Sequence, residues 1–374
     1  MNKKIITLGF ILVLTTLSYS GCLEYLPFDD GSTTYESHPT KIKYTISYGY
    51  NISCTGLGKY NILYNCDLPE LINGLITNTQ ILYTGYTEQK VENNNIVTWD
   101  IDSVNADKNQ PNTYKLGIKS DIESQSYLIT DLTGADAATT DEIKNNYIET
   151  YQKFTKKQTA NGHDYIDPDN KYIQTATNDA LKNVNTNNSF IIAKQLFSWL
   201  KENTKYKLHT TNNDVQSAQT TCILKTGDCD DLSFLYISMC RTAGVPARFI
   251  RGYLLSDEDG VVSIVAHAWV EVFVGEKIGK NGWIPVECAG VSNSAENLAE
   301  TEIHQNFGLE SAYHLRLFTD DGTNESLNFS ISGPLVKYDS GMKIEMKSFA
   351  EIEKYLKDQE NELHIDKDGQ RRYQ

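Results

Sequence analysis

Residues 225–233, KTGDCDDLS, open a stretch whose apolar residues recur at the spacing of one helical face. That face is formed by Leu232, Leu235, Tyr236, Met239, Cys240 and Ala243. Gly244 and Pro246 end the pattern, so we expect one amphipathic helix. Cys229 lies at its N-terminus on the inward face, where unpaired backbone N–H groups and the helix dipole favour a thiolate. We interpret Cys229 as a nucleophile; the alternative is a buried structural cysteine, the usual role of a free thiol.

Two downstream segments favour the nucleophile. Residues 266–272, AHAWVEV, carry His267 in a strand-like segment, and residues 282–287, GWIPVE, end at Glu287. A cysteine at a helix start, a histidine on a strand and a carboxylate on the next strand supply a nucleophile, a base and a group that orients the base. Cys229, His267 and Glu287 are therefore the predicted catalytic residues. Glu271 is a rival for the third position, but it lies four residues along the strand from His267, about 13 Å away.

These segments resemble a known family. The stretches GDCDDLSFLYISMCRTAGVPARFIRGY (227–253), HAWVEV and GWIPVE look like the Cys, His and acid blocks of the transglutaminase-like (papain-like thiol enzyme) superfamily. The resemblance covers roughly residues 176–315 and implies a core in which the Cys-bearing helix packs on an antiparallel sheet. The family usually has Asp where this chain has Glu287, whose side chain is one methylene longer.

The resemblance also implies an activity. It predicts a thiol enzyme that acts on amide bonds, of the peptide or the glutamine type, through a thioester acyl-enzyme; the N-terminal segment described below predicts that this enzyme lies outside the cytoplasm. Hydrolysis needs only water, so a peptidase is favoured over a transglutaminase. Two alternatives stay open: a catalytically inactive binding module of the same fold, and a structural surface protein in which the cysteine is incidental. No cofactor or metal is predicted, and without a CxxC motif a structural zinc site is not expected.

Three acidic residues surround the predicted nucleophile: Asp228, Asp230 and Asp231. We interpret them as helix-capping and first-turn carboxylates that complement the helix dipole. Their charge would raise the pKa of the thiol, so an imidazolium at His267 has to more than offset it. With that partner, we expect the pKa of Cys229 to be lowered overall.

Four further residues near the blocks have open roles. Arg248 and Arg251 are expected to pair with these acids or with Glu258 rather than to bind substrate. Trp269 and Trp283 either wall a groove for the acyl group or simply cover the sheet.

The first 22 residues resemble a lipoprotein signal. Lys3 and Lys4 precede an apolar run over residues 5–17, and small residues then lead to Cys22. The run is shorter than the about 20 residues that a membrane-spanning helix needs. Cys22 is the predicted lipidated residue, on a chain anchored to the outer face of the cell membrane or secreted. Tyr19 departs from the aliphatic residue usual at that position, so plain secretion and an uncleaved anchor are alternatives.

The chain of 374 residues has a formal net charge of −15. This charge argues against binding to nucleic acid, whose phosphate backbone requires a basic surface. The expected partners are a protein or peptide substrate, and the membrane through the N-terminal segment. Cys54 and Cys66 flank a turn and could close a disulfide in an oxidising compartment, but the pairing among Cys54, Cys66, Cys222 and Cys288 stays open.

The predicted fold class is α+β, with an all-β sandwich-like domain before the transglutaminase-like core. From Lys41 onward, alternating apolar residues and short strands separated by Gly, Asn and Asp turns predict that domain. The expected divisions are a signal (1–22), a tether (23–40), the β domain (41–135), a helical linker (136–175), the catalytic domain (176–315) and a C-terminal extension (316–374). Within the extension, residues 348–363 have the spacing of a helix.

Overall fold

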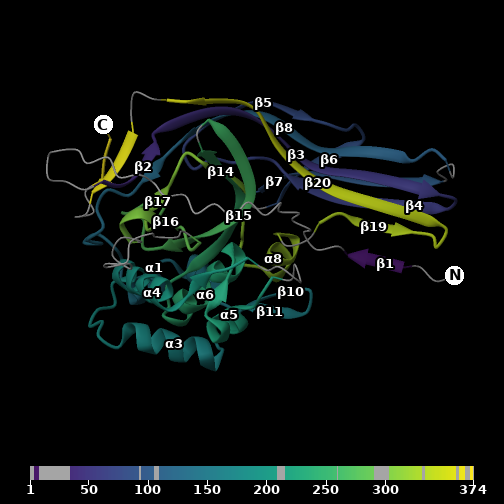
Figure 1. Ribbon diagram of the computed structural model, residues 1–374. Coiled ribbons are helices and arrows are strands. Elements are labelled where there is room, and N and C mark those ends of the chain that lie inside the picture. Colours follow the sequence, from purple (N-terminus) through teal and green to yellow (C-terminus); the bar gives the residue numbers. More distant parts are fainter. Residues whose placement is uncertain are drawn as a thin grey trace.

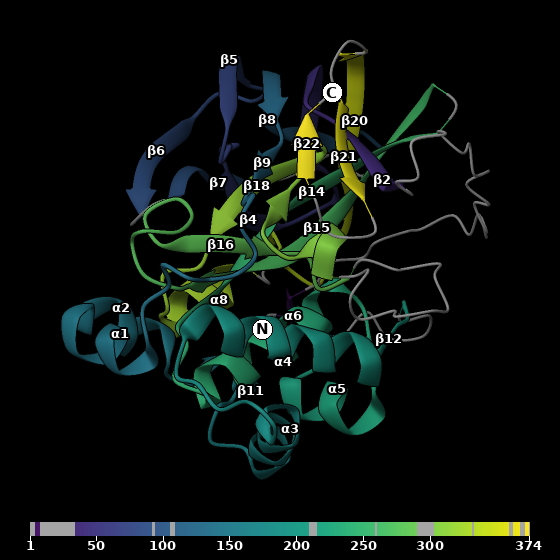
Figure 2. The same cartoon turned by 90° about the vertical axis from the view of Figure 1, so that its left-hand side faces the viewer.

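The computed structural model describes residues 4–7, 34–91, 94–104, 109–208, 215–258, 260–289, 303–330, 333–358, 362–366 and 371–373. Figures 1 and 2 show three layers: a sandwich of two long β-sheets, a shorter sheet beneath it, and helices on the far face of that shorter sheet. The α+β class expected from the sequence is confirmed.

The sandwich consists of two antiparallel sheets whose facing side chains form one apolar core. Trp99 is fully buried in this core and stacks on Tyr64, with ring centroids 5.7 Å apart. The first sheet, of order β20-β3-β8-β5, contains β3 (Lys41–Gly56), β5 (Gly74–Ile81), β8 (Asn112–Gln125) and β20 (Met342–Lys357). The second, of order β1-β19-β4-β7-β6, contains β1 (Lys4–Thr7), β4 (Lys59–Asp67), β6 (Tyr86–Val91), β7 (Asn94–Val104) and β19 (Leu335–Tyr338).

The C-terminal part of the chain is built into both sheets of the sandwich, which differs from the separate extension expected after residue 315. β19 pairs with β4, and β20 pairs with β3 along its whole length. The helix expected over residues 348–363 is therefore wrong. A β-bulge between Ile352 and Lys354 explains the misleading spacing. Its extra residue shifts the alternation, so that Ile352 and Tyr355, three positions apart, both pack against the sandwich core.

The N-terminal segment is described only over β1, a short strand that pairs with β19. Cys22, the predicted lipidation site, lies outside the described residues. Within the described ranges, no helix combines the length and the apolar character that crossing a membrane requires.

The possible disulfide between Cys54 and Cys66 is not formed, because both are free, buried thiols. The two cysteines lie on strands of different sheets, joined by a turn at residues 57–58. Cys54 precedes that turn by three residues and Cys66 follows it by eight. At about 3.3 Å per residue the two are offset by about 16 Å along the strands, beyond the roughly 7 Å between Cα atoms that a disulfide allows. Cys222 and Cys288 are also free.

The shorter sheet, here called the central sheet, has the antiparallel order β16-β15-β14-β18. Its side chains alternate between two faces. Ala268 and Val270 belong to the core shared with the helices, whereas His267, Trp269 and Glu271 lie on the opposite face. The strands are β14 (Ala247–Glu258), β15 (Val261–Phe273), β16 (Trp283–Val286) and β18 (His314–Thr319).

Helices cover the apolar face of the central sheet, and α6 packs directly on β14 and β15 (Figure 1). These helices are α3 (Lys171–Leu181), α4 (Ser189–Asn203), α5 (Ala218–Leu224) and α6 (Cys229–Thr242). The expected linker contains α1 (Thr140–Asn146), α2 (Ile148–Phe154), β10 (Gln158–Ala160) and β11 (His163–Ile166). The remaining elements are β2 (Thr34–Pro39), β9 (Tyr127–Leu128), β12 (Lys205–Tyr206), β13 (Thr226–Gly227), β17 (Leu309–Glu310), α8 (Asn324–Ser330), β21 (Glu362–Asp366) and β22 (Arg371–Tyr373).

A buried ion network ties β14, β15, β17 and β18 together on the polar face of the central sheet. Arg248 donates to Glu271 Oε2 at 2.6 and 2.8 Å, and Arg316 donates to Glu271 Oε1 at 2.6 Å. Arg316 also pairs with Glu310, which accepts from Trp269 Nε1 at 3.0 Å. Burial works to raise the pKa of Glu271, but the two guanidinium groups outweigh it and lower the pKa to about 2.

Glu271→Gln should lower the free energy of unfolding at pH 7 by about 3–5 kcal/mol, because the buried guanidinium groups of Arg248 and Arg316 lose a carboxylate partner, and Arg316 keeps only Glu310. The carboxylate contributes this stability above its ordinary pKa of 4.5, and the contribution is lost as the pH falls toward 2. Urea unfolding should therefore show a difference in unfolding free energy between wild type and Glu271→Gln that narrows as the pH falls below 4.5. Glu149→Gln, on a side chain 85% exposed, is the control. Equal stability of Glu271→Gln and wild type at pH 7 would contradict the role of the network.

Candidate active site

The start of α6 is fixed by the carboxylate of Asp231. Its Oδ2 accepts a hydrogen bond from the backbone N–H of Asp228 at 3.1 Å and closes a capping box. It also accepts from the side chain of Gln216 at 2.9 Å. Gly227 is required beside it, because a Cβ there would lie 2.5 Å from the Cβ of Asp231. The interpretation of Asp228 and Asp231 as capping residues agrees with these contacts.

Cys229 is the first residue of α6, and its sulfur lies beside strand β15. β16 pairs with β15 only as far as Val286, opposite Val270, so Ala268 lies beyond the last pair. The Cys229 sulfur makes a backbone hydrogen bond with Ala268 at this edge of the sheet. The thiol also donates to Asp230 Oδ1, at 3.7 Å. Within the described part of the chain, no hydrogen bond joins the sulfur to the His267 side chain.

The surroundings of the thiol favour its protonated form. Burial is the largest cause, followed by the charges of Asp230, Asp228 and Glu287, and together they raise the pKa of Cys229 well above its ordinary value. The backbone hydrogen bond with Ala268 acts in the opposite direction but does not outweigh them. The lowered pKa expected from the sequence is therefore wrong for this conformation. Carboxylates in and beside the first helical turn offset the positive end of the helix dipole.

His267 and Glu287 meet through the register of β15 and β16. Val286 pairs with Val270, so Glu287 follows opposite Trp269 and shares its face with His267. His267 Nε2 lies 2.6 Å from Glu287 Oε2, and Glu287 Oε1 accepts from the backbone N–H of Ala289 at 2.7 Å. Burial works to raise the pKa of Glu287, but the neighbouring imidazoles of His267 and His314 outweigh it and hold the pKa well below its usual range.

His314, on β18, is a member of this cluster that the sequence interpretation missed. Its Nε2 lies 3.1 Å from the same Glu287 oxygen, and its Nδ1 lies 3.0 Å from Ser311 Oγ. The alternation of His314 and Arg316 with apolar neighbours is the signal that could have placed it on the polar face of a strand. The ligand atoms of His267, Glu287 and His314 all lie within 4.8 Å of one another, so this cluster could hold a metal ion.

The other residues noted in the sequence have structural partners. Arg248 pairs with Glu271 and Arg251 pairs with Asp67 at 2.6 Å, rather than with the acids expected for them, although the charge of Arg251 also opposes the rise in the pKa of Asp230 that burial causes. Arg248 also lies 4.0 Å from the ring centroid of Trp283. The Trp283 ring, like that of Trp269, is buried in the fold.

Tyr206 is a second residue near the thiol that the sequence did not reveal. β12 pairs in parallel with β13, and this places Tyr206 opposite Gly227, two residues before Cys229. Burial, with the charges of Cys229, Asp228 and Glu287, raises the pKa of Tyr206. Only the tertiary pairing brings this residue close, so no local sequence pattern could have found it.

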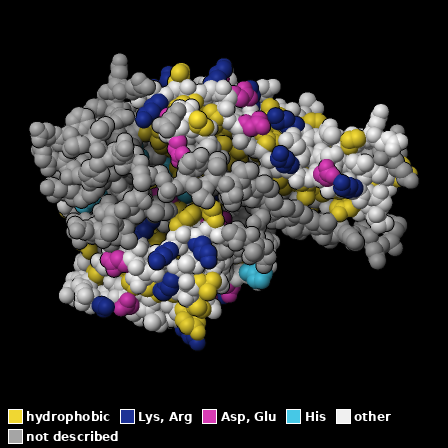
Figure 3. Space-filling view, in the orientation of Figure 1, with side chains coloured by type: hydrophobic (Ala, Val, Ile, Leu, Met, Phe, Trp, Pro, Cys, Tyr) yellow, Lys and Arg dark blue, Asp and Glu magenta, His cyan; other side chains and the backbone are white. Residues whose placement is uncertain are grey.

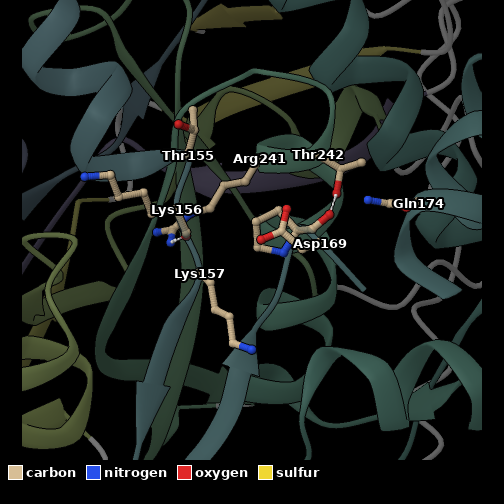
Figure 4. Close-up of a pocket in the computed structure, with 8 residues that line it drawn as sticks. Thr155, Lys156, Lys157, Asp169, Gln174, Arg241 and Thr242 are labelled. Atoms are coloured by element: carbon tan, nitrogen blue, oxygen red, sulfur yellow. Dashed lines mark hydrogen bonds between the residues drawn. The ribbon is translucent and has the colours of Figure 1, made fainter. Parts of the chain in front are cut away.

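A polar depression of about 530 Å³ lies elsewhere, at the C-terminal end of α6 (Figure 4). Arg241 and Thr242 line it with Lys156 and Asp169. Arg241 follows Cys229 by twelve residues, which is about 18 Å along a helix, so this depression is separate from the thiol. Basic and acidic side chains are interspersed over the face shown in Figure 3, and the net negative charge is not gathered there.

Comparison with known proteins agrees with this geometry. The sequence pattern of the transglutaminase-like superfamily matches residues 176–288. An uncharacterized protein of Bacillus subtilis (strain 168), YebA, is 34% identical over 83 residues, which are 19% of this chain and 11% of YebA. The chain therefore spans only about a tenth of the length of that relative.

A solved structure has a similar fold. A candidate cysteine protease from Cytophaga hutchinsonii matches 83% of this chain and 91% of its own, with a TM-score of 0.51 and 14% identity. At that identity the likeness concerns the fold alone. The periplasmic domain of TgpA from Pseudomonas aeruginosa matches 69% of this chain and 92% of its own with a TM-score of 0.30 and 12% identity, which is too low to support any argument.

The Cys-bearing helix on its antiparallel sheet, the pairing of His267 with Glu287, and the matching sequence pattern lead to one assignment. Residues 176–288 of this chain are a domain of the transglutaminase-like superfamily.

Proposed function

We propose that this protein is a thiol enzyme that cleaves amide bonds in peptides or proteins, with Cys229 as nucleophile, His267 as base and Glu287 as the residue that orients the base. The observation that carries the proposal is the 2.6 Å contact between His267 Nε2 and Glu287 Oε2, on a strand whose next residue, Ala268, bonds the Cys229 sulfur. Because Nε2 is held by the carboxylate, Nδ1 is the imidazole nitrogen left to exchange a proton with the thiol.

The raised pKa of Cys229 determines how the first step runs. The thiol rests with its proton on, so His267 Nδ1 takes that proton as the sulfur attacks the carbonyl carbon. The resulting imidazolium is stabilised by Glu287 and gives the proton to the leaving nitrogen as the C–N bond breaks. A thioester then joins substrate and enzyme. Water attacks it, His267 takes the water proton, and the sulfur leaves and recovers its proton from the imidazolium.

The backbone N–H of Cys229 supports the oxyanion in this proposal, since the first N–H groups of a helix have no partner within it. Water suffices as the acceptor, so a peptidase is preferred over a transglutaminase. The resemblance in fold to a candidate cysteine protease is consistent with that preference. The second candidate is an inactive binding module, and the raised thiol pKa is the observation that favours it.

Cys229→Ala should abolish covalent labelling by iodoacetamide and all turnover in a peptide screen, without unfolding the chain. His267→Ala should slow labelling at pH 7, because the base that removes the thiol proton is missing. Glu287→Gln should lower turnover more than labelling, since the imidazole is misplaced while the sulfur remains. Rates would be followed by intact-mass spectrometry.

Cys222→Ala, which removes a buried thiol, and the exposed Glu149→Gln should leave these rates unchanged. If Cys229 in the wild type labels no faster than in His267→Ala, the enzyme proposal fails and the binding module takes its place.

Replacing the carboxylate of Asp230 should have the opposite effect to replacing His267, because it should speed up labelling. Its charge raises the pKa of the Cys229 thiol. Asp230→Asn should therefore lower the thiol pKa, and labelling at pH 7 should become faster, by up to about tenfold for each unit of pKa that is removed. The pH dependence of labelling is the measurement, and the half-maximal pH should fall relative to wild type. An unchanged or higher half-maximal pH would contradict this electrostatic account.

We also propose that the enzyme works outside the cytoplasmic membrane, held there by a lipid on Cys22. The support is the N-terminal sequence, with its two lysines, its apolar run and the small residues before Cys22. The mature chain should start at Cys22, without the edge strand β1, and partition into detergent. Intact-mass analysis of protein from membranes would read both the start and the lipid mass. Cys22→Ala should release the chain or leave it unprocessed. A mature chain with an unmodified Cys22 would refute this placement.

A further inference from the structure

A thiol mechanism uses one histidine, but the carboxylate of Glu287 contacts two. His267 Nε2 and His314 Nε2 lie 2.6 and 3.1 Å from the same oxygen, Oε2. The side chains of His267, Glu287 and His314 are largely buried, at 7%, 11% and 8% exposed. The second histidine therefore needs an explanation of its own, because the proposed reaction proceeds without it.

We propose that His267, Glu287 and His314 form a binding site for a zinc-type divalent cation, and that a bound cation switches the thiol site off. The second half of this proposal rests on the proposed function; the first half does not. Two imidazoles and one carboxylate are a ligand set that Zn²⁺ takes in proteins, with a fourth position left to water. Ca²⁺ and Mg²⁺ prefer oxygen ligands, so the cluster discriminates against them.

The geometry of the cluster is close to what such a cation needs. The three ligand atoms lie within 4.8 Å of one another. Around a tetrahedral Zn²⁺, with bonds of about 2.0–2.2 Å, ligand atoms lie about 3.4 Å apart. The two contacts to Glu287 would lengthen slightly, while the imidazoles would approach each other. The three residues come from separate segments: His267 from β15, His314 from β18 and Glu287 from the end of β16. Each side chain can therefore rotate without moving the backbone of the other two.

The proton positions explain why a bound cation would inhibit. Each imidazole now directs Nε2 at the carboxylate, so Nε2 carries the hydrogen. A bound cation needs the lone pair of Nε2. The hydrogen of each neutral imidazole then has to be on Nδ1 instead of Nε2, and no proton leaves the ring. On His314 the Nδ1–H then donates to Ser311 Oγ, 3.0 Å away, which holds the ring in place. On His267 the protonated Nδ1 is no longer able to accept the proton of the Cys229 thiol.

The rival explanation is a cation held by the thiol itself. The Cys229 sulfur bonds Asp230 and the backbone of Ala268, not a member of the cluster. Removing the sulfur should therefore leave the proposed site intact, whereas a thiol-bound cation would be lost with it.

The test is equilibrium dialysis of the purified full chain against zinc chloride, with bound zinc counted by mass spectrometry. Wild type, Cys229→Ala and His163→Gln should each bind one equivalent, since His163 is exposed and far from the cluster in the chain. His314→Gln should bind at least tenfold more weakly, and Ser311→Ala, which leaves all three ligands present, about tenfold to a hundredfold more weakly. Thermal unfolding of each variant would identify any that fail to fold. If His314→Gln fails to fold, zinc binding by Ser311→Ala tests the site instead.

Zinc should also slow iodoacetamide labelling of wild type and His163→Gln, while the labelling of His314→Gln should not respond to the same zinc concentration. Loss of binding in Cys229→Ala with binding kept in His314→Gln would overturn the site in favour of the thiol. Absence of a bound equivalent in wild type would overturn it outright. If the thiol labels slowly in every variant without zinc, the proposed function fails, while the dialysis result still decides the metal site.

Discussion

Strand β15 has to suit two surroundings at once, because its side chains alternate between the helical core and the polar face of the central sheet. Ala268 and Val270 fill the core beneath α6, while His267 and Glu271 join the polar face. A slip of one residue would exchange the two sets and bury charge among apolar helices. The pairing of Val270 with Val286 prevents this. The packing of α6, the ion network and the His267–Glu287 contact all depend on that one register.

The two faces of this strand also differ in charge balance. On the polar face each buried carboxylate has cationic or imidazole partners: Glu271 and Glu310 have guanidinium groups, and Glu287 has two histidines. At the edge of the sheet the Cys229 thiol is instead surrounded by acids. A thiol that keeps its proton at rest reacts slowly with oxidants. In an oxidising compartment this restraint would preserve the nucleophile between turnovers.

Local patterns in the sequence were sufficient to predict the α6 helix, the strand that carries His267 and the return strand that ends at Glu287. Each of these signals lies within a few residues of the side chain concerned. The register between β15 and β16 was not readable, because a turn of uncertain length separates the strands. His314 and Tyr206 were missed for a related reason, since only pairing between distant segments brings them to Glu287 and Cys229. The bulge in β20 made the apolar spacing misleading, because its one extra residue gave an alternating strand the spacing of a helix.

The pairing of β20 with β3 sets an order of events for a chain that is made from its N-terminus. Met346 lies opposite Ile52, roughly 300 residues later, and contacts of such separation are slow to form. At about 5–20 residues per second, β3 waits roughly 15–60 s for this neighbour while the chain is synthesised. Until then one edge of a long, apolar strand has no partner, and such an edge invites aggregation. A protein arranged in this way benefits if the sandwich closes only after the whole chain has been made.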